Sequence, residues 1–313
     1  MRPSLSIFRQ LCYRLILSSL GLMASGCAVR HTTHVPVAQV PPPAKEATLP
    51  ELEDRINRQS SAIQTLNATV DLAPAAGSVY SGVIKEYHDV KGFILVARPQ
   101  MIRIIGQAPV VRTNIFDMVS NGQEFELYLP TKQKFIVGKT TFRRPSKNAL
   151  ESLRPQHILD ALLVPAIDSG HQQCFLKEDE DSAHRYYVVE IVESGTTGST
   201  ALMLERELWF DRSTLDLVRL RLYGPNGSYI EDVHYAGYRD FQGVRYPATV
   251  QITRPVEDYS LSITIAKAVF NQPIAPEKFV LKKPEGAQLV QLSQATRPPE
   301  PAAGRSRGAS YGQ

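Results

Sequence analysis

The sequence has few cysteines and no apolar run long enough to cross a membrane. Its 313 residues include only Cys12, Cys27 and Cys174. The apolar run nearest the N-terminus, residues 15–24, is about 10 residues long, whereas a bilayer-spanning helix needs about 20. With so few candidate cross-links, the fold must be held by burial of apolar side chains. A body of more than 200 residues is large enough for that.

Little net charge belongs to the body of the chain. The formal net charge is +4, and residues 1–26 contain Arg2, Arg9 and Arg14 but no acid, which leaves +4 − 3 = +1 for the rest. A protein that binds nucleic acid through its backbone needs a concentrated basic surface. The sequence therefore predicts no nucleic-acid partner.

Motifs for catalysis and for metal binding are also missing. There is no Gly-x-Ser-x-Gly segment, and the glycine-rich residues 195–199 lack the lysine of a phosphate-binding loop. The acidic run 177–181 lacks the spacing of a calcium loop. His31 and His34 lie in a proline-rich stretch with no third ligand nearby. We therefore predict no metal, no cofactor and no enzymatic activity. A hydrolase is disfavoured because no nucleophile–base pair is evident.

The N-terminus has the parts of an export signal. A charged start precedes the apolar run, and the small residues Ala24, Ser25 and Gly26 stand directly before Cys27. This box resembles a bacterial lipoprotein signal, although that family prefers leucine at the position of Ala24. The resemblance implies cleavage after Gly26 and acylation of Cys27, with palmitate among the acyl chains, and several chains anchor a protein stably. An ordinary secretory signal with a chance cysteine is the alternative.

The residues after Cys27 suggest a spacer and a location. Ala28 follows the cysteine, and the absence of aspartate there favours the outer membrane over the inner membrane. Residues 27–48 are rich in proline and read as a spacer that lifts the body off the bilayer, facing the periplasm.

The body of the chain is predicted to be one helix followed by many short strands. Apolar residues at helical spacing predict an amphipathic helix from about residue 50 to 66. From residue 67 the pattern changes to runs rich in Val, Ile, Phe and Tyr, broken by turn signals such as Asn121-Gly122. Residues 146–153 and 155–163 interrupt the strands as one or two short helices. About a dozen strands are expected, at residues 80–88, 92–97, 101–106, 113–120, 124–129, 134–138, 172–177, 185–192, 200–210, 215–223, 229–238, 244–254 and 260–270.

Short links between consecutive strands predict a curled antiparallel sheet with one apolar face. In several strands apolar residues alternate with polar ones, and Arg206 intrudes on the apolar face of its strand. Few helices are available to cover this face, so a concave cavity for an apolar ligand is one interpretation and a fully packed core is the other. The residues predicted to line the cavity are Leu202, Leu204, Leu208, Phe210, Leu220, Leu222, Val250, Ile252, Leu261, Ile263 and Ile265.

Three segments carry a resemblance to a known group. Residues 207–220 (ELWFDRSTLDLVRL) look like a strand–turn–strand unit of the LolA/LolB-like lipoprotein carrier and receptor superfamily. Residues 238–247 (YRDFQGVRYP) resemble a segment of outer-membrane lipoproteins of that group. Residues 268–281 (AVFNQPIAPEKFVL) resemble its closing strand, Asn-x-Pro link and final strand. The resemblance covers about residues 50–285.

The resemblance implies an incomplete β-barrel of about eleven strands, lidded by an N-terminal helix and short central helices, around an apolar cavity. The fold class is then mainly β (α+β), with domains at residues 1–26 (signal peptide), 27–48 (lipidated cysteine and spacer), 49–285 (half-barrel) and 286–313 (disordered tail). The implied function is binding of the acyl chains of a lipid or lipoprotein at the outer membrane, in lipoprotein sorting or envelope lipid transport. The alternative is a structural outer-membrane lipoprotein with a packed core that acts through envelope protein partners.

Overall fold

The computed structural model describes residues 43–77, 84–86, 90–141, 153–194, 202–224 and 226–292. All of them lie in the compact unit Val40–Gln313, and the unit Met1–Gln39 lies outside the described residues. The helices are α2 (Leu49–Ala62) and α3 (Pro155–Leu162), with 3-10 turns η1 (Pro130–Lys132) and η3 (Pro276–Phe279). The strands are β1 (Thr65–Ala76), β2 (Lys85–Glu86), β3 (Val90–Ala97), β4 (Met101–Gln107), β5 (Asn114–Ser120), β6 (Glu124–Leu129), β7 (Lys134–Lys139), β8 (Gln172–Glu180), β9 (Arg185–Ser194), β10 (Leu202–Asp211), β11 (Leu217–Tyr223), β12 (Tyr229–Ala236), β13 (Arg239–Phe241), β14 (Val244–Tyr246), β15 (Thr249–Arg254), β16 (Tyr259–Phe270) and β17 (Gln288–Leu292).

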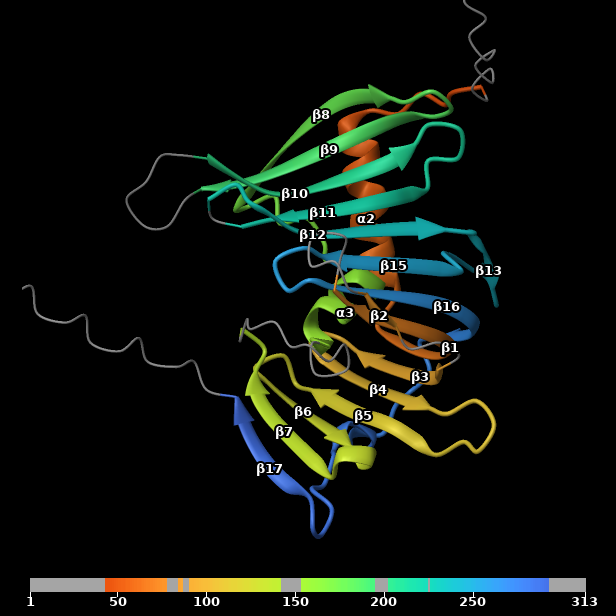
Figure 1. Cartoon of the computed structure of the whole chain (residues 1–313). Helices are drawn as coiled ribbons and strands as arrows, with labels where there is room; N and C mark the ends of the chain where they lie inside the picture. Colours follow the sequence, from red (N-terminus) through yellow and green to blue (C-terminus); the bar gives the residue numbers. More distant parts are fainter. Residues whose placement is uncertain are drawn as a thin grey trace, which may run out of the picture. The chain divides into compact units, whose positions relative to one another are not determined.

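One large curled sheet contains almost all of these strands (Figure 1). Its order is β17-β7-β6-β5-β4-β3-β1-β16-β15-β12-β11-β10-β9-β8, with β2 paired to β1, and β13 and β14 form a separate two-stranded ribbon. The pairs are antiparallel except for β17 with β7. Two meanders, β3 to β7 and β8 to β16, therefore meet at β1, which pairs with both β3 and β16. The sheet does not close, and this confirms the predicted fold class.

Alternation along the strands gives the sheet one buried face. In β16, Leu261, Ile263 and Ile265 are buried, while the residues between them are more exposed. β4 and β6 show the same period of two. Because successive side chains of a strand point to opposite faces, the buried set of each strand lies on one side of the sheet. The two helices occupy that side, which is the concave face (Figure 1).

Helix α2 begins with a proline and a local carboxylate contact. Glu51 accepts hydrogen bonds from the Thr48 backbone nitrogen at 2.7 Å and from the Thr48 hydroxyl at 2.9 Å. The arrangement satisfies a donor at the start of the helix, where donors lack intrahelical partners. Leu52 and Ile56 are buried against the sheet. No helix in the described ranges is long and apolar enough to cross a bilayer.

The helix ends earlier than the sequence pattern predicts. It stops at Ala62, and β1 starts at Thr65, whereas the apolar spacing predicts a helix to residue 66. Leu66 is buried in both readings, because it also starts the alternating buried set of β1. A contact distant in sequence sets the end: the Asn271 amide donates to the Ala62 carbonyl at 2.7 Å and accepts from the Gln64 backbone nitrogen at 2.8 Å.

The strand prediction differs from the structure in three places. The large sheet has fifteen strands within the described ranges rather than about eleven. Strand β1 was missed, because its first residues continue the helical spacing. Strand β17 extends the fold to Leu292, past the boundary predicted at residue 285, since five residues after Gly286 pair with the edge strand β7. Most of the predicted strand at 80–88 lies outside the described residues. The same holds for almost all of the predicted helix at 146–153.

Candidate functional site

The concave face contains an apolar row that crosses six strands in register. Direct pairing joins Val189 to Leu208, Leu208 to Leu220, Leu220 to Val233, Val233 to Ile252, and Ile252 to Leu261. Among the residues predicted to line a cavity, those buried on this face are Leu208, Phe210, Leu220, Val250, Ile252, Leu261, Ile263 and Ile265. The structure therefore brings most of the predicted set together.

Three residues of the predicted set lie at the margin of this face. Leu202 is the first residue of β10 and is 47% exposed. Leu204 and Leu222 are partly buried, because they lie near the ends of their strands.

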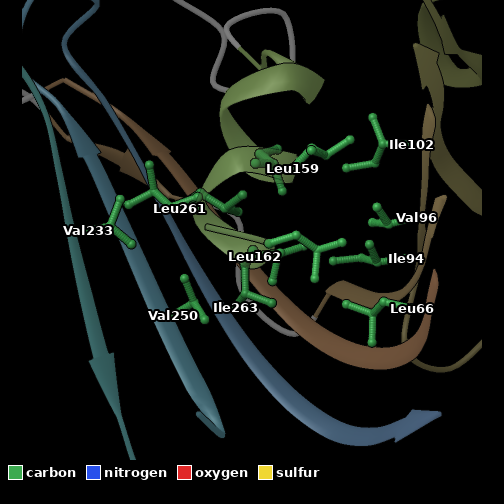
Figure 2. Close-up of a cluster of buried hydrophobic side chains, with 14 of the residues drawn as sticks. Leu66, Ile94, Val96, Ile102, Leu159, Leu162, Val233, Val250, Leu261 and Ile263 are labelled. Carbon is green, nitrogen blue, oxygen red and sulfur yellow. The ribbon is translucent and has the colours of Figure 1, made fainter. Parts of the chain in front are cut away.

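Helix α3 occupies the space between the two halves of the curl. Leu159 and Leu162 lie between two walls of the sheet (Figure 2). One wall contributes Val233, Val250, Leu261 and Ile263 from β12, β15 and β16, and the other contributes Leu66, Ile94, Val96 and Ile102 from β1, β3 and β4. Both leucines are at most 3% exposed. In this structure the apolar side chains of the helix stand where an apolar ligand of the concave face would lie.

Two clefts that described residues line beside the helices are small. One cleft lies between the end of α2, Arg98 and residues 162–164, and has a volume of about 10 Å³. A second lies between α2, Phe210, Tyr238 and Arg245, and has a volume of about 50 Å³. Pockets for small-molecule ligands are roughly 300–1,000 Å³. Neither of these two clefts can therefore hold an acyl chain unless a helix moves.

Four side chains from the large sheet, the β3–β4 turn and the β13–β14 ribbon hold the C-terminal end of α3 and the residues that follow it. The Tyr235 hydroxyl donates to the Ala161 carbonyl at 2.9 Å, and the Tyr246 hydroxyl donates to the Leu162 carbonyl. Arg98 donates to the carbonyls of residues 163 and 164 at 3.3 Å. Arg206 donates to those of residues 165 and 166 at 3.1 and 3.0 Å. The carbonyls of Ala161 and Leu162 are among those that a helix end leaves unpaired, those of residues 163–166 follow the helix, and cations suit the negative end of the helix dipole.

Three of the four donor side chains are buried away from solvent. Tyr235, Tyr246 and Arg206 are at most 5% exposed, and burial raises the pKa of both tyrosines far above the usual range. Burial likewise lowers the pKa of the Arg206 guanidinium. A buried donor of this kind is costly to leave without an acceptor. With α3 in this position, the carbonyls of residues 161–166 are thus the acceptors that these donors require.

A row of ionisable groups lies beside the apolar row. Arg254 donates to Glu231 and, at 2.9 Å, to Glu257, and all three residues are at most 4% exposed. His157 of α3 approaches Glu231 with Nδ1 at 3.6 Å from Oε2. Burial raises the pKa of Glu231 to about 7, and the neighbouring Arg254 only partly opposes this rise. The Glu231 carboxyl group therefore stays protonated up to nearly neutral pH.

Helix α3 brings one more carboxyl group to this region. Burial raises the pKa of Asp160 to about 6, while Gln156 and the cations Arg206 and Arg98 oppose the rise. The Gln156 amide donates to Asp160 at 3.3 Å. Asp160 thus supplies negative charge near the two guanidinium groups that hold the end of its helix.

An apolar tip is exposed on the β4–β5 hairpin. Val110 is 88% exposed and Val111 is 69% exposed. The turn is closed by backbone hydrogen bonds from Ala108 to Thr113 at 2.9 Å and from Arg112 to Ala108 at 3.1 Å. Two valines expose only a small apolar area, which is much less than the large apolar patch that marks an interaction site.

Several predicted residues cannot be placed. Ala24, Ser25, Gly26 and Cys27 lie outside the described residues.

Cys174 lies on β8 and is partly buried, and burial raises the pKa of its thiol to about 12. A thiol that stays protonated is a poor nucleophile. Among the described residues, no group of three or more His, Cys, Asp and Glu side chains could hold a metal ion.

The four donors were not singled out from the sequence. For Arg206, Tyr235 and Tyr246 the acceptors are main-chain atoms of α3 or of the segment after it, 40 or more residues away, and no residue pattern reports such a contact. Arg206 gave the available signal, because it interrupts an otherwise apolar face of its strand.

Comparison with known proteins gives a likeness in fold. The chain matches no protein-family model and no curated protein. It is similar to a DUF1329 family protein from Desulfovibrio piger, with a TM-score of 0.49 and 13% identity over 73% of this chain and 94% of that one. It is similar to a LolA superfamily protein from Nitrosomonas europaea, with a TM-score of 0.46 and 14% identity over 74% and 97%. It is also similar to a domain from Vibrio parahaemolyticus described as a putative outer membrane lipoprotein-sorting protein domain. The TM-score is 0.46, with 12% identity over 73% of this chain and 94% of that one.

One of these structures belongs to the superfamily that the sequence motifs resemble. The TM-scores lie below 0.5, so the likeness says nothing about a ligand of this chain.

Proposed function

We propose that this protein binds the acyl chains of a lipid or lipoprotein on the concave face of its sheet. The observation that carries the proposal is the apolar row of an unclosed sheet, in which Leu159 and Leu162 of a short helix take the place of a ligand. Binding exchanges α3 for the acyl chain. The role is one of binding, in lipoprotein sorting or envelope lipid transport, and it includes no catalytic step.

The energies of this exchange are of similar size. Burial of an acyl chain with about fifteen methylene groups contributes about 12 kcal/mol. Exposure of Ile158, Leu159 and Leu162 costs about 5–9 kcal/mol in total. The hydrogen bonds to the end of α3 contribute about 0.5–1.5 kcal/mol each. The six hydrogen bonds add about 3–9 kcal/mol, so the total cost of about 8–18 kcal/mol is of the same order as the gain of about 12 kcal/mol.

The proposal includes a membrane anchor. Cleavage after Gly26 would leave Cys27 as the first residue, acylated and embedded in the outer membrane, with the body in the periplasm. The lipobox Ala24-Ser25-Gly26-Cys27 supports this part of the proposal. Two lipids are then involved: a covalent anchor at Cys27 and an exchangeable ligand on the concave face.

Uptake of a fluorescent fatty acid by the chain from residue 28 onward tests the binding function, because this chain contains all described residues. We expect saturable uptake, and a bound lipid in native mass spectrometry of the purified protein. The double variant Leu159→Ala and Leu162→Ala should take up the probe more tightly, since α3 then competes less well. The control is Leu289→Ala at a half-exposed position on β17. A protein that is free of lipid and takes up no probe in any of these forms would rule the function out.

A second candidate function rests on the firm attachment of α3. Six hydrogen bonds from four side chains hold its C-terminal end, and the clefts lined by described residues are small. These features favour a structural envelope lipoprotein with a packed core that acts through protein partners. Crosslinking in cells, followed by purification, would support this candidate if it gave one stoichiometric protein partner and no lipid.

A further inference from the structure

The four donors below α3 impose a chemical requirement on whatever replaces the helix. Tyr235, Tyr246, Arg98 and Arg206 come from β12, β14, the β3–β4 turn and β10, and they converge on the six consecutive carbonyls 161–166. If α3 leaves, these carbonyls leave with it. The donors belong to the large sheet, the β3–β4 turn and the β13–β14 ribbon rather than to α3, so they remain.

A plain hydrocarbon would satisfy the apolar walls but not these donors. Tyr235, Tyr246 and Arg206 are buried, and a buried donor that loses its acceptor destabilises the state in which it is left unpaired. Sites that are built to hydrogen-bond a ligand group discriminate strongly against analogues that lack it. The ligand must therefore present acceptor oxygens next to its apolar chains.

Helix α3 itself shows the pattern that fits. It presents Leu159 and Leu162 to the two apolar walls and, directly afterwards, a run of carbonyl oxygens to the donors (Figure 2). An acyl ester or an acyl amide has the same order of parts: apolar chains that end in carbonyl groups. The end of α3 is then an internal substitute for the head of the ligand.

We infer that Tyr235, Tyr246, Arg98 and Arg206 form a binding site for the ester or amide carbonyls of an acylated ligand. This inference rests on the proposed acyl-chain binding and adds the chemical class of the ligand: acylated glycerol or acylated amine rather than free hydrocarbon or ether lipid. The two tyrosines take single carbonyls, and each guanidinium spans a pair, as it does now at residues 163–164 and 165–166.

The test compares two phospholipids with identical short chains and head group, one a diester and the other a diether without carbonyl oxygens. Binding of each to the chain from residue 28 onward is measured by calorimetry. The readout is the ratio of the two dissociation constants, because any loosening of α3 changes both affinities equally and cancels. We expect the diester to bind about tenfold more tightly, since each hydrogen bond corresponds to about a two- to twelvefold change.

Variants assign the preference to the donors. Tyr235→Phe and Tyr246→Phe should each reduce the ratio about threefold, within the range expected for one hydrogen bond. Tyr259→Phe is the matched control, because the Tyr259 hydroxyl is buried and has no hydrogen-bond partner among the described residues. Leu159→Ala is the second control: it should strengthen binding of both lipids and leave the ratio unchanged.

The outcomes separate this inference from the function on which it rests. If neither lipid binds, the proposed function fails and the inference fails with it. If both lipids bind with a ratio near one in the unmodified protein, the function stands and the donor set serves only to hold α3. A tenfold ratio that survives both tyrosine substitutions would also overturn the assignment. If one tyrosine variant fails to fold, the ratio in the unmodified protein together with the other variant still tests the assignment.

Discussion

Replacing Glu231 by glutamine should flatten the pH dependence of folding stability. Glu231 is fully buried on β12, and burial raises its pKa from 4.5 to about 7 despite the ion pair with Arg254. Glutamine keeps nearly the same shape and cannot ionise. Arg254 also pairs with Glu257 at 2.9 Å, and the substitution does not remove this partner.

The sign and size follow from the two pKa values. Below about pH 4.5 Glu231 is protonated in both the folded and the unfolded chain, and its full contribution to stability is present. As the pH rises from about 4.5 to 7, the unfolded chain ionises first, so stability is lost. The difference between 4.5 and about 7, at about 1.4 kcal/mol per pH unit, gives a loss of about 3 kcal/mol. Asp160, whose pKa is raised to about 6, adds a loss in the same direction and stays in the variant.

Urea denaturation at pH 5 and pH 8 measures this effect. The unmodified protein should lose several kcal/mol of unfolding free energy between the two pH values, and Glu231→Gln should lose about 2–3 kcal/mol less, because part of the loss has already occurred at pH 5. The exposed Glu285 supplies the control Glu285→Gln, which should behave like the unmodified protein. If Glu231→Gln lost as much stability as the unmodified protein between pH 5 and 8, the reasoning from burial would be wrong. If the variant were much less stable at pH 8, the ion pair with Arg254 would outweigh the cost of burial.

Three further predictions concern the core and the anchor. Leu162→Ala should lower the free energy of unfolding by about 3 kcal/mol, and Leu289→Ala by less than about 1 kcal/mol, because of these two only Leu162 lies in the packed interior. Denaturant titration measures the loss in both variants, and a small loss at Leu162 would contradict close packing around α3. Gly106→Ala should cost about 1–3 kcal/mol by the same measurement, since an added Cβ would lie 2.2 Å from the Phe116 ring. Cys27→Ser should abolish labelling by radioactive palmitate and release the protein from the membrane fraction, and continued labelling would contradict acylation at Cys27.

The sequence predicted the sheet better than the helix-to-strand junction. Alternation identified most of the strands from β3 to β16, since a half-buried strand repeats every two residues. β1 was missed because Ile63 and Leu66 fit both the helical and the extended spacing. The choice between them depends on Asn271, which ends the helix from more than 200 residues away. No local pattern contains that information.

For the site, the sequence predicted which side chains share a face but not what covers them. The eight buried residues of the predicted cavity follow from period-two alternation alone. Whether the face is open or filled depends on α3, whose position is fixed by Arg98, Arg206, Tyr235 and Tyr246 through contacts with main-chain carbonyls. Such acceptors look alike at every residue, so the sequence does not mark them. Arg206 stood out because a charged residue on an apolar face requires a partner.

The pairing of β1 with β16 has a consequence for the order of folding. Leu66 lies opposite Phe270, so the centre of the sheet joins residues about 200 positions apart. Each meander can form from neighbouring hairpins, but the seam between them closes a long loop, and such non-local pairings form slowly. Until β16 arrives, one edge of β1 is unpaired and open to association with other chains. The final strands of the domain therefore determine when its first strand becomes protected.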